Sequence, residues 1–232
     1  MKTVRLDKFL SDNTRHSRSE IKQLIKDNKV TVNGVIIKQS DIHINPFDAR
    51  VTVNGVPVIY KKFVYLAINK PSGILSASND KNRKTVVDLV GEDYAHYSLF
   101  PVGRLDKDTT GLLILTNDGD FAHKVISPKS NIEKSYVATV DSCPPKDLSD
   151  RFIEGIVLAD GTVCKSAMAQ IINDNTVRIV LTEGKYHQVK RMLGVLGLGV
   201  NALHRERIGK LSLPDNLSVG EYVEILPEDI GM

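Results

Sequence analysis

The pattern of apolar residues changes near residue 60, and this change constrains the fold more than any other feature of the chain. Before it, apolar residues recur at helical spacing and are followed by hairpin signals. After it, short β-favouring segments alternate with turn signals, and the few helical patterns do not alternate regularly with strands. Such an arrangement is typical of α+β domains. We therefore predict an α+β protein with a small domain at residues 1–58 and a larger domain at residues 59–232.

Two short helices are predicted at the start of the chain. Leu6, Phe9 and Leu10 have the i, i+3, i+4 spacing of one buried helix face. Ser17, followed three positions later by Glu20, has the pattern of a capping box, in which each of the two side chains binds the backbone N–H of the other residue. A second helix is therefore expected to begin at Ser17.

Positive charge is concentrated in the same part of the chain. Residues 1–40 hold nine Lys or Arg against four Asp or Glu, although the net charge of the whole chain is only +3. Arg18, Lys22 and Lys26 recur every four residues, so three cations lie on one face of the second helix. Such a face is often only solvated surface, but it also fits a polyanion.

The segment 30–37 follows the second helix, and its central Asn-Gly pair predicts a β-hairpin.

The larger domain is expected to consist of strands separated by turns, with three helices. A turn is expected at residues 117–120, where Asn, Asp, Gly and Asp follow one another. The strands are predicted at 63–68, 112–115, 135–140 and 177–181, and the helices at 86–90, 121–126 and 187–196.

A charged loop is the most informative segment of the larger domain. It runs from Gly103 to Gly111 between two apolar stretches and contains Asp106 between Arg104 and Lys107. Charged loops between strands are commonly only solvated connections. Here, however, nearby cations would lower the pKa of an Asp by about 1–3 units and keep it ionised. An ionised carboxylate can act as a nucleophile or a base.

The sequence gives no pattern for a metal site, a disulfide framework or a membrane span. Cys143 and Cys164 are too isolated for a zinc knuckle, and we expect both to be free thiols. His204 and Glu206 have the H-x-E spacing of zinc deaminases, but no Pro-Cys-x-x-Cys follows. The segment 117–120 lacks the spaced ligands of a calcium loop. No apolar run reaches the length of a membrane span, so we expect a cytoplasmic protein.

The N-terminal elements resemble the S4 RNA-binding module. The resemblance rests on RLDKFL at 5–10, SRSEIKQLI at 17–25 and KVTVNGVII at 29–37. It implies a docking surface for folded RNA, on which cations face the phosphates. The cations it assigns to this surface are Arg5, Lys8, Arg18, Lys22 and Lys26.

The rest of the chain resembles the pseudouridine synthases of the RsuA family. The matching segments are NKPSG at 69–73, GRLDKDTTGLLILTNDG at 103–119, EKSYVATV at 133–140, EGKYHQVKRMLG at 183–194 and LHRERIG at 203–209. The resemblance implies a mixed, mainly antiparallel sheet with flanking helices. It also implies that the protein is an isomerase.

The same resemblance assigns roles to individual residues. Asp106 matches the essential aspartate of the family, Tyr136 the tyrosine of its K-x-Y motif, and Lys190 the basic residue of its HQ-x-[KR] motif. Lys190 is expected to pair with Asp106, and Arg104 to fill or support the stack that a flipped base leaves. Asp108 has no corresponding role.

The resemblance is strongest to the branch that acts on 16S ribosomal RNA, at a uridine of the uridine-516 type. Pseudouridine formation moves the uracil from an N1–C1′ to a C5–C1′ bond without electron or phosphoryl transfer, so no metal or other cofactor is expected. The expected partner is ribosomal RNA or a small-subunit assembly particle, and the expected state is a monomer. Two alternatives remain: a synthase acting on 23S ribosomal RNA, and a non-catalytic S4-type RNA-binding or ribosome-assembly factor.

Overall fold

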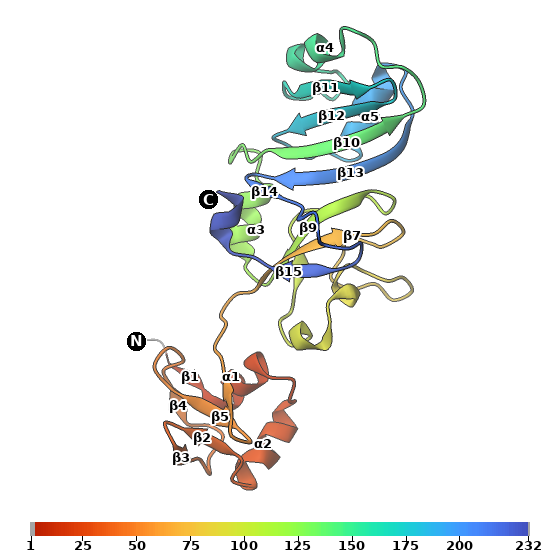
Figure 1. Cartoon of the computed structure of the whole chain (residues 1–232). Coiled ribbons are helices and arrows are strands. Elements are labelled where there is room, and N and C mark those ends of the chain that lie inside the picture. The colour runs from red at the N-terminus through yellow and green to blue at the C-terminus, as the bar shows by residue number, and fades with distance from the viewer. Residues whose placement is uncertain (1–2, 232) are drawn as a thin grey trace. The chain divides into compact units, whose positions relative to one another are not determined.

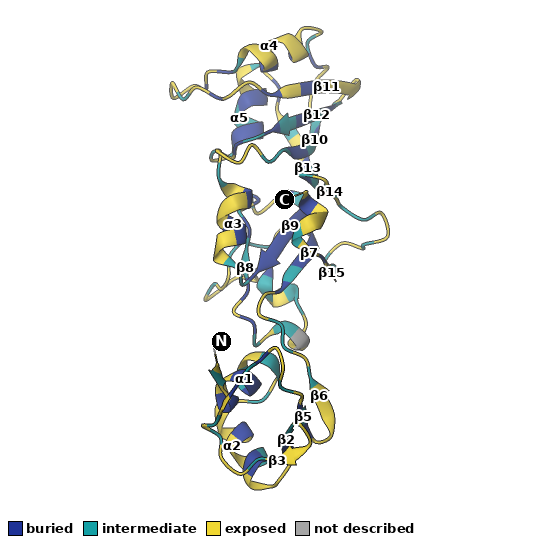
Figure 2. Cartoon of the chain, turned by 90° about the vertical axis from the view of Figure 1, so that its left-hand side faces the viewer, coloured by how far each residue is buried: buried dark blue, intermediate teal, exposed yellow. Residues whose placement is uncertain are grey.

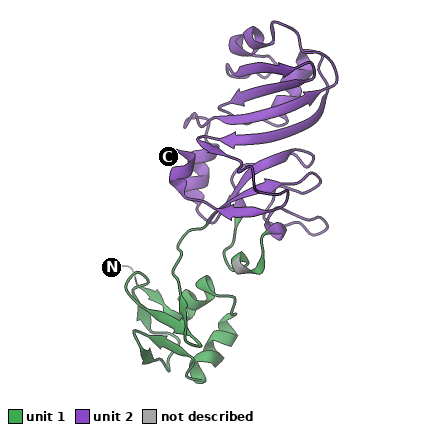
Figure 3. Ribbon diagram, viewed as in Figure 1, with its two compact units in different colours: residues 1–64, 90–99 green, residues 65–89, 100–232 purple. Residues whose placement is uncertain are grey.

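The computed structural model describes residues 3–231, which form two compact units (Figure 3). One unit comprises the chain up to Val64 together with Val90–Leu99, and the other comprises Tyr65–Leu89 and the chain from Phe100 onward. None of the helices described is long and apolar enough to cross a membrane.

Both helices expected in the first unit are present. Helix α1 spans Leu6–Asn13, and α2 spans Arg18–Lys26 (Figure 1). Ser17 caps α2 with the complete capping box: its hydroxyl accepts from the Glu20 N–H, and the Glu20 carboxylate accepts from the Ser17 N–H. The predicted apolar stripes face inward, and Leu6, Leu10 and Ile21 are fully buried.

Six strands complete this unit. Four of them form a sheet in the order β3-β2-β5-β6, and β1 and β4 pair in a separate two-stranded sheet. Their bounds are Val4–Arg5 for β1, Val30–Val32 for β2, Val35–Ile36 for β3, His43–Ile44 for β4, Val51–Val53 for β5 and Val56–Val58 for β6. The Asn-Gly pair at 33–34 makes the expected hairpin turn, and a second pair at 54–55 makes another, because Asn33, Gly34, Asn54 and Gly55 all have positive φ angles.

The second unit is built on one large mixed sheet. Its strand order is β11-β12-β10-β13-β9-β7-β15, with β8 added beside β9 and β14 beside β13. All neighbouring strands are antiparallel except β13 and β9. The bounds are Tyr65–Lys70 for β7, Phe100–Pro101 for β8, Thr110–Thr116 for β9, Lys134–Val140 for β10, Met168–Asn173 for β11, Thr176–Leu181 for β12, Val200–Ile208 for β13, Leu211–Ser212 for β14 and Tyr222–Glu224 for β15. The expected α+β class and mainly antiparallel sheet are confirmed.

Three α-helices cover this sheet. They are α3 (Gly119–Ile126), α4 (Leu148–Glu154) and α5 (Gln188–Val195). Helices α4 and α5 share one apolar core with strands β10 to β13, and α3 packs in a second core with β7 and β9. Strands β7 and β9 are buried along almost their whole length (Figure 2).

Two local predictions were wrong. The segment 117–120 is not a simple turn, because the Asp118 carboxylate accepts from the N–H groups of Asp120 and Phe121 and so starts α3. The helix expected at 86–90 is only a short 3-10 turn at Val87–Leu89. A segment of five residues is too short to nucleate a stable α-helix there.

The parallel contact between β9 and β13 joins the two halves of the sheet. It pairs Thr110 with His204 and Gly111 with Arg205. Gly111 has a φ of +99°, and a Cβ at this position would lie 2.3 Å from the Arg205 carbonyl oxygen. Only glycine therefore allows the strands to approach this closely. The approach brings the end of the charged loop against β13.

Candidate active site

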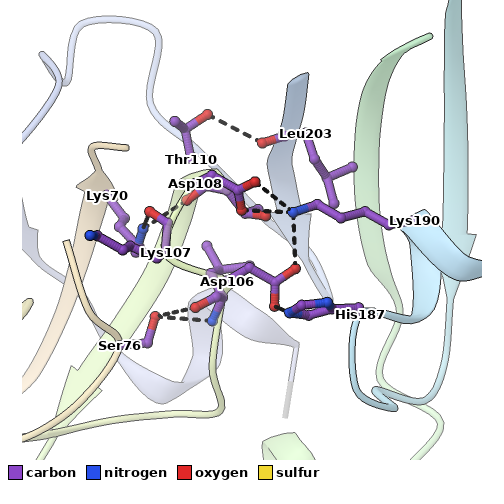
Figure 4. Close-up of polar contacts among 11 residues, drawn as sticks. Lys70, Ser76, Asp106, Lys107, Asp108, Thr110, His187, Lys190 and Leu203 are labelled. Carbon is purple, nitrogen blue, oxygen red and sulfur yellow. Dashed lines mark hydrogen bonds and ion pairs between the residues drawn. The ribbon is translucent and has the colours of Figure 1, made fainter. Parts of the chain in front are cut away.

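The charged loop between β8 and β9 is fixed by contacts on both sides of Asp106 (Figure 4). The buried Ser76 hydroxyl donates to the Leu105 carbonyl at 2.8 Å and accepts from the Leu105 N–H at 3.0 Å. The Thr109 N–H then donates to the Asp106 carbonyl at 3.1 Å. The backbone around Asp106 is thus held in place by contacts that do not involve the Asp106 side chain.

Lys70, at the end of β7, holds the second half of this loop through its side chain. Its side chain is completely buried, and its ammonium donates to the carbonyls of Pro71, Lys107 and Thr109 at 3.0, 3.1 and 2.8 Å. Burial lowers the pKa of Lys70 to about 8, although the charges of Asp108 and Asp106 oppose that shift. The three carbonyls use all three N–H groups of the ammonium.

The Asp106 carboxylate lies between two basic side chains that come from the same short segment. Its Oδ1 is 3.3 Å from His187 Nε2, and its Oδ2 is 3.3 Å from Lys190 Nζ. The side chain keeps 24% of its surface exposed, so it can be reached from the cavity in front of it. The expected pairing of Lys190 with Asp106 is therefore present in the structure.

Lys190 also contacts Asp108, and more closely. Its Nζ lies 2.7 and 2.9 Å from the two carboxylate oxygens of Asp108. Burial alone would lower the pKa of Lys190, but the hydrogen bond to Asp108 and the charges of Asp106 and Asp108 outweigh it and raise that pKa. The same hydrogen bond lowers the pKa of Asp108. Asp108 therefore anchors the ammonium that faces Asp106.

His187 is the residue at this site that the sequence did not indicate. It precedes α5 directly, in a left-handed conformation with a φ of +48° that non-glycine residues seldom adopt. Its ring stacks on that of Tyr186, with centroids 3.8 Å apart. His187 is three positions before Lys190, close to one helical turn, and this spacing was the available signal.

An open cavity of about 1000 Å³ lies in front of Asp106. Asp106, Tyr136 and Arg104 all line it, so the loop and β10 bring these three expected site residues together. Arg104 is exposed and has no hydrogen-bond or ion-pair partner among the residues described. The hydroxyl of Tyr136 accepts from Arg205 at 3.4 Å.

The expected RNA-binding cations of the first unit are all exposed, but they differ in their partners. Arg5 pairs with Asp7 at 2.7 Å, and Lys8 pairs with Asp12 at 3.0 Å. The three cations of α2 form no ion pair with any residue in the described range 3–231. These three, which we call the α2 stripe, are Arg18, Lys22 and Lys26.

The arrangement suits chemistry at a carboxylate. Within residues 3–231, no group of three or more His, Cys, Asp or Glu side chains is placed to hold a metal ion. Both cysteines are free thiols, as expected, and Cys164 is buried. A carboxylate between a histidine and an ammonium group, at the wall of a cavity with an aromatic ring, can attack or deprotonate a bound nucleoside.

Comparison with known proteins agrees with this geometry. The family model described as RNA pseudouridylate synthase matches residues 64–194, and the S4 domain model matches residues 4–49. An uncharacterised RNA pseudouridine synthase of Bacillus subtilis (strain 168) is 43% identical over 98% of this chain and 97% of its own.

Further relatives agree over the same length. A protein named ribosomal small subunit pseudouridine synthase A from Escherichia coli (strain K12) is 36% identical over 98% of both chains, and its namesake from Yersinia pestis is 37% identical over 98% of this chain and 97% of its own. A crystal structure of a pseudouridylate synthase superposes with a TM-score of 0.69, 33% identity and 98% coverage of both chains. The chain therefore belongs to the RNA pseudouridylate synthase family, with an S4 domain in its N-terminal part.

Proposed function

We propose that this protein converts a uridine of ribosomal RNA to pseudouridine and that Asp106 is its central catalytic residue. The reaction breaks the N1–C1′ bond, turns the uracil, joins C5 to C1′, releases the C5 proton and leaves a proton on N1. It needs a group that acts on the nucleoside and a cavity that holds the base outside the helix.

The observation that carries this proposal is the position of the Asp106 carboxylate. It lies between His187 and Lys190, at the wall of the cavity that Tyr136 also lines. The ring of Tyr136 offers a face against which an extruded base can stack. Lys190 places a positive charge beside the carboxylate and is itself held by Asp108.

The choice of RNA rests on the first unit and on the relatives. The α2 stripe presents three unpaired cations on one helix face, which suits the phosphates of a folded RNA. Several full-length relatives are named as enzymes of the small ribosomal subunit. We therefore place the target in 16S ribosomal RNA, with residues 1–58 as the docking domain and residues 59–232 as the catalytic domain.

Release of tritium tests the reaction directly, because C5 must lose its hydrogen when it is joined to C1′. Ribosomal RNA carrying uridine tritiated at C5 should release its label to water with the wild-type protein. Asp106→Asn should abolish release while RNA binding remains, because an amide cannot act as nucleophile or base. Asp120→Asn is the matched control, since Asp120 is exposed in the first turn of α3 and lies outside the cavity.

The outcomes separate the competing functions. Release by folded Asp106→Asn at the wild-type rate would contradict the role of Asp106. No release by the wild type on any ribosomal RNA or assembly particle would favour a non-catalytic RNA-binding factor. A map of pseudouridines in RNA from cells with and without the protein would distinguish a 16S target from a 23S target.

A further inference from the structure

Two buried cations line the catalytic cavity and have no acidic partner among residues 3–231. We infer that Arg205 and Lys134 bind the carbonyl oxygens of the extruded uracil and stabilise the negative charge that develops on the base. The inference rests on the proposed function and adds the residues that bind the leaving base.

Strand pairing places both cations on the same side of the sheet as Tyr136. Lys134 and Tyr136 are two positions apart on β10, so their side chains point to the same face. Arg205 of β13 is the direct cross-strand partner of Tyr136. All three residues line the cavity that contains Asp106.

Arg205 is held in place by two hydrogen bonds, but one of its terminal nitrogens has no acceptor. It is 4% exposed, its Nε donates to the Leu112 carbonyl at 2.8 Å, and one terminal nitrogen donates to the Tyr136 hydroxyl at 3.4 Å. The other terminal nitrogen is buried and has no partner in the structure. A buried guanidinium nitrogen without an acceptor is costly, which indicates that a ligand supplies the acceptor.

Lys134 is a second buried cation to which no acidic side chain of the described residues is paired. It is 8% exposed, and its ammonium makes no hydrogen bond or ion pair with any residue in the described part of the chain. Burial, together with the charge of Arg205, lowers the pKa of Lys134 to about 8. Lys134 therefore still carries its charge at neutral pH.

The carboxylates of the cavity are engaged with other groups. Asp106 faces His187 and Lys190. The second carboxylate, Glu183, accepts from the Lys165 N–H and from the side chains of Lys185 and Gln188. Neither carboxylate forms an ion pair with Arg205 or Lys134. The site thus presents two uncompensated cations to whatever enters.

The depth of the two cations favours the base over the phosphate as their ligand. The phosphates of the target nucleotide stay attached to the RNA chain outside the cavity, whereas the base is the part that can be inserted furthest. The uracil edge offers two carbonyl oxygens, and Arg205 and Lys134 are both donors without acceptor capacity.

Charge on the base appears during the reaction and not before it. When the N1–C1′ bond breaks, its electron pair goes to the uracil, which then carries one negative charge delocalised over N1 and the carbonyl oxygens. The charge disappears when C5 bonds to C1′. The C5 proton then leaves to water while N1 takes up a proton, so the product is a neutral isomer. Addition of the Asp106 carboxylate to the ring would also place negative charge on a carbonyl oxygen. Two fixed cations therefore stabilise the intermediate more than the bound uridine.

Binding of an anionic uracil analogue tests this inference without requiring turnover. 5-Nitrouracil keeps the ring and both carbonyl oxygens of uracil, adds a nitro group at C5 and ionises at a lower pH, so a pH exists at which only the nitro compound is an anion. We expect the wild type to bind it at least about tenfold more tightly than uracil, as an analogue of the charged intermediate. Arg205→Met and Lys134→Met should each lose this preference. Arg178→Met is the matched control, because Arg178 pairs with Glu206 outside the cavity.

Kinetics supply the second readout. In single turnover on ribosomal RNA, Lys134→Met and Arg205→Met should each lower the rate about a hundredfold or more, the usual effect of removing one donor to a developing anion. Their affinity for RNA should stay at the wild-type value, which also shows that the variants are folded. If Arg205→Met fails to fold, the less constrained Lys134→Met carries the test.

Three results would overturn the inference. The wild type could bind 5-nitrouracil no better than uracil, or the two variants could keep the preference. Alternatively, inorganic phosphate could displace the nitro compound while the variants lose RNA affinity instead of rate, which would assign the cations to a phosphate. If the wild type forms no pseudouridine at all, the proposed function fails, and 5-nitrouracil binding still reports on the two cations separately.

Discussion

Replacing Lys70 with methionine should lower both the stability of the second unit and the rate of pseudouridine formation. The substitution keeps the length and apolar stem of the side chain but removes the donor to three carbonyls. The Lys107 carbonyl keeps the Gly73 N–H at 2.8 Å as a donor, so the carbonyls of Pro71 and Thr109 lose the most. Two acceptors left without this donor, one buried and one partly buried, at about 1–2 kcal/mol each, give an expected destabilisation of about 2–4 kcal/mol.

This loss is smaller than the total stability of most domains, so the variant should still fold and can be assayed. Urea unfolding measures the destabilisation, and tritium release at a temperature well below the transition measures the rate. We expect a decrease in rate of about tenfold or more, because a displacement of about 1 Å in the loop that carries Asp106 is enough to disturb catalysis. Lys107→Met is the control: its side chain is exposed, and its stability should change by less than about 0.5 kcal/mol. Wild-type stability and rate in folded Lys70→Met would refute the anchoring role of Lys70.

Two further predictions concern the other charged groups. Changing Arg18, Lys22 and Lys26 together to glutamine should weaken binding to ribosomal RNA and flatten its dependence on salt, because each lost phosphate contact removes about 0.7–0.9 from the log-log slope; an unchanged slope would exclude the α2 stripe from docking. Lys190→Arg should keep substantial tritium-release activity because the charge beside Asp106 persists, whereas Lys190→Met should lose most of it, and equal activity of the two variants would remove Lys190 from the site.

The elements that local chemistry determines could be predicted from the sequence. The capping box at Ser17 and the Asn-Gly pair at 33–34 act over a few residues, and the structure confirms the helix and the hairpin they indicate. The strands predicted at 135–140 and 177–181 also agree with β10 and β12 within a residue or two. In these segments the order of apolar and polar residues along the chain is enough to indicate a strand.

The elements that depend on distant contacts could not be predicted in this way. Helix α4 and strands β11 and β13 were missed, because they are stabilised by a core assembled from segments far apart in the chain. His187 was missed for the same reason: its contact with Asp106 depends on how α5 packs, not on a local pattern. The Lys190–Asp106 pair was expected only because the family resemblance supplied it, and its closer contact with Asp108 was not foreseen.

The parallel pairing of β9 with β13 determines when in folding the catalytic centre can exist. Arg205 reaches Leu112 across 93 positions of sequence, so the wall behind Asp106 closes only after β13 has docked on β9. Contacts of such long range form late, because the intervening chain must first lose its freedom. A nascent or clipped chain that lacks β13 can hold a finished RNA-docking unit and the antiparallel pair of β7 and β9 while its catalytic cavity remains open on one side. Binding should therefore mature before activity, and a partly folded molecule would occupy RNA without modifying it.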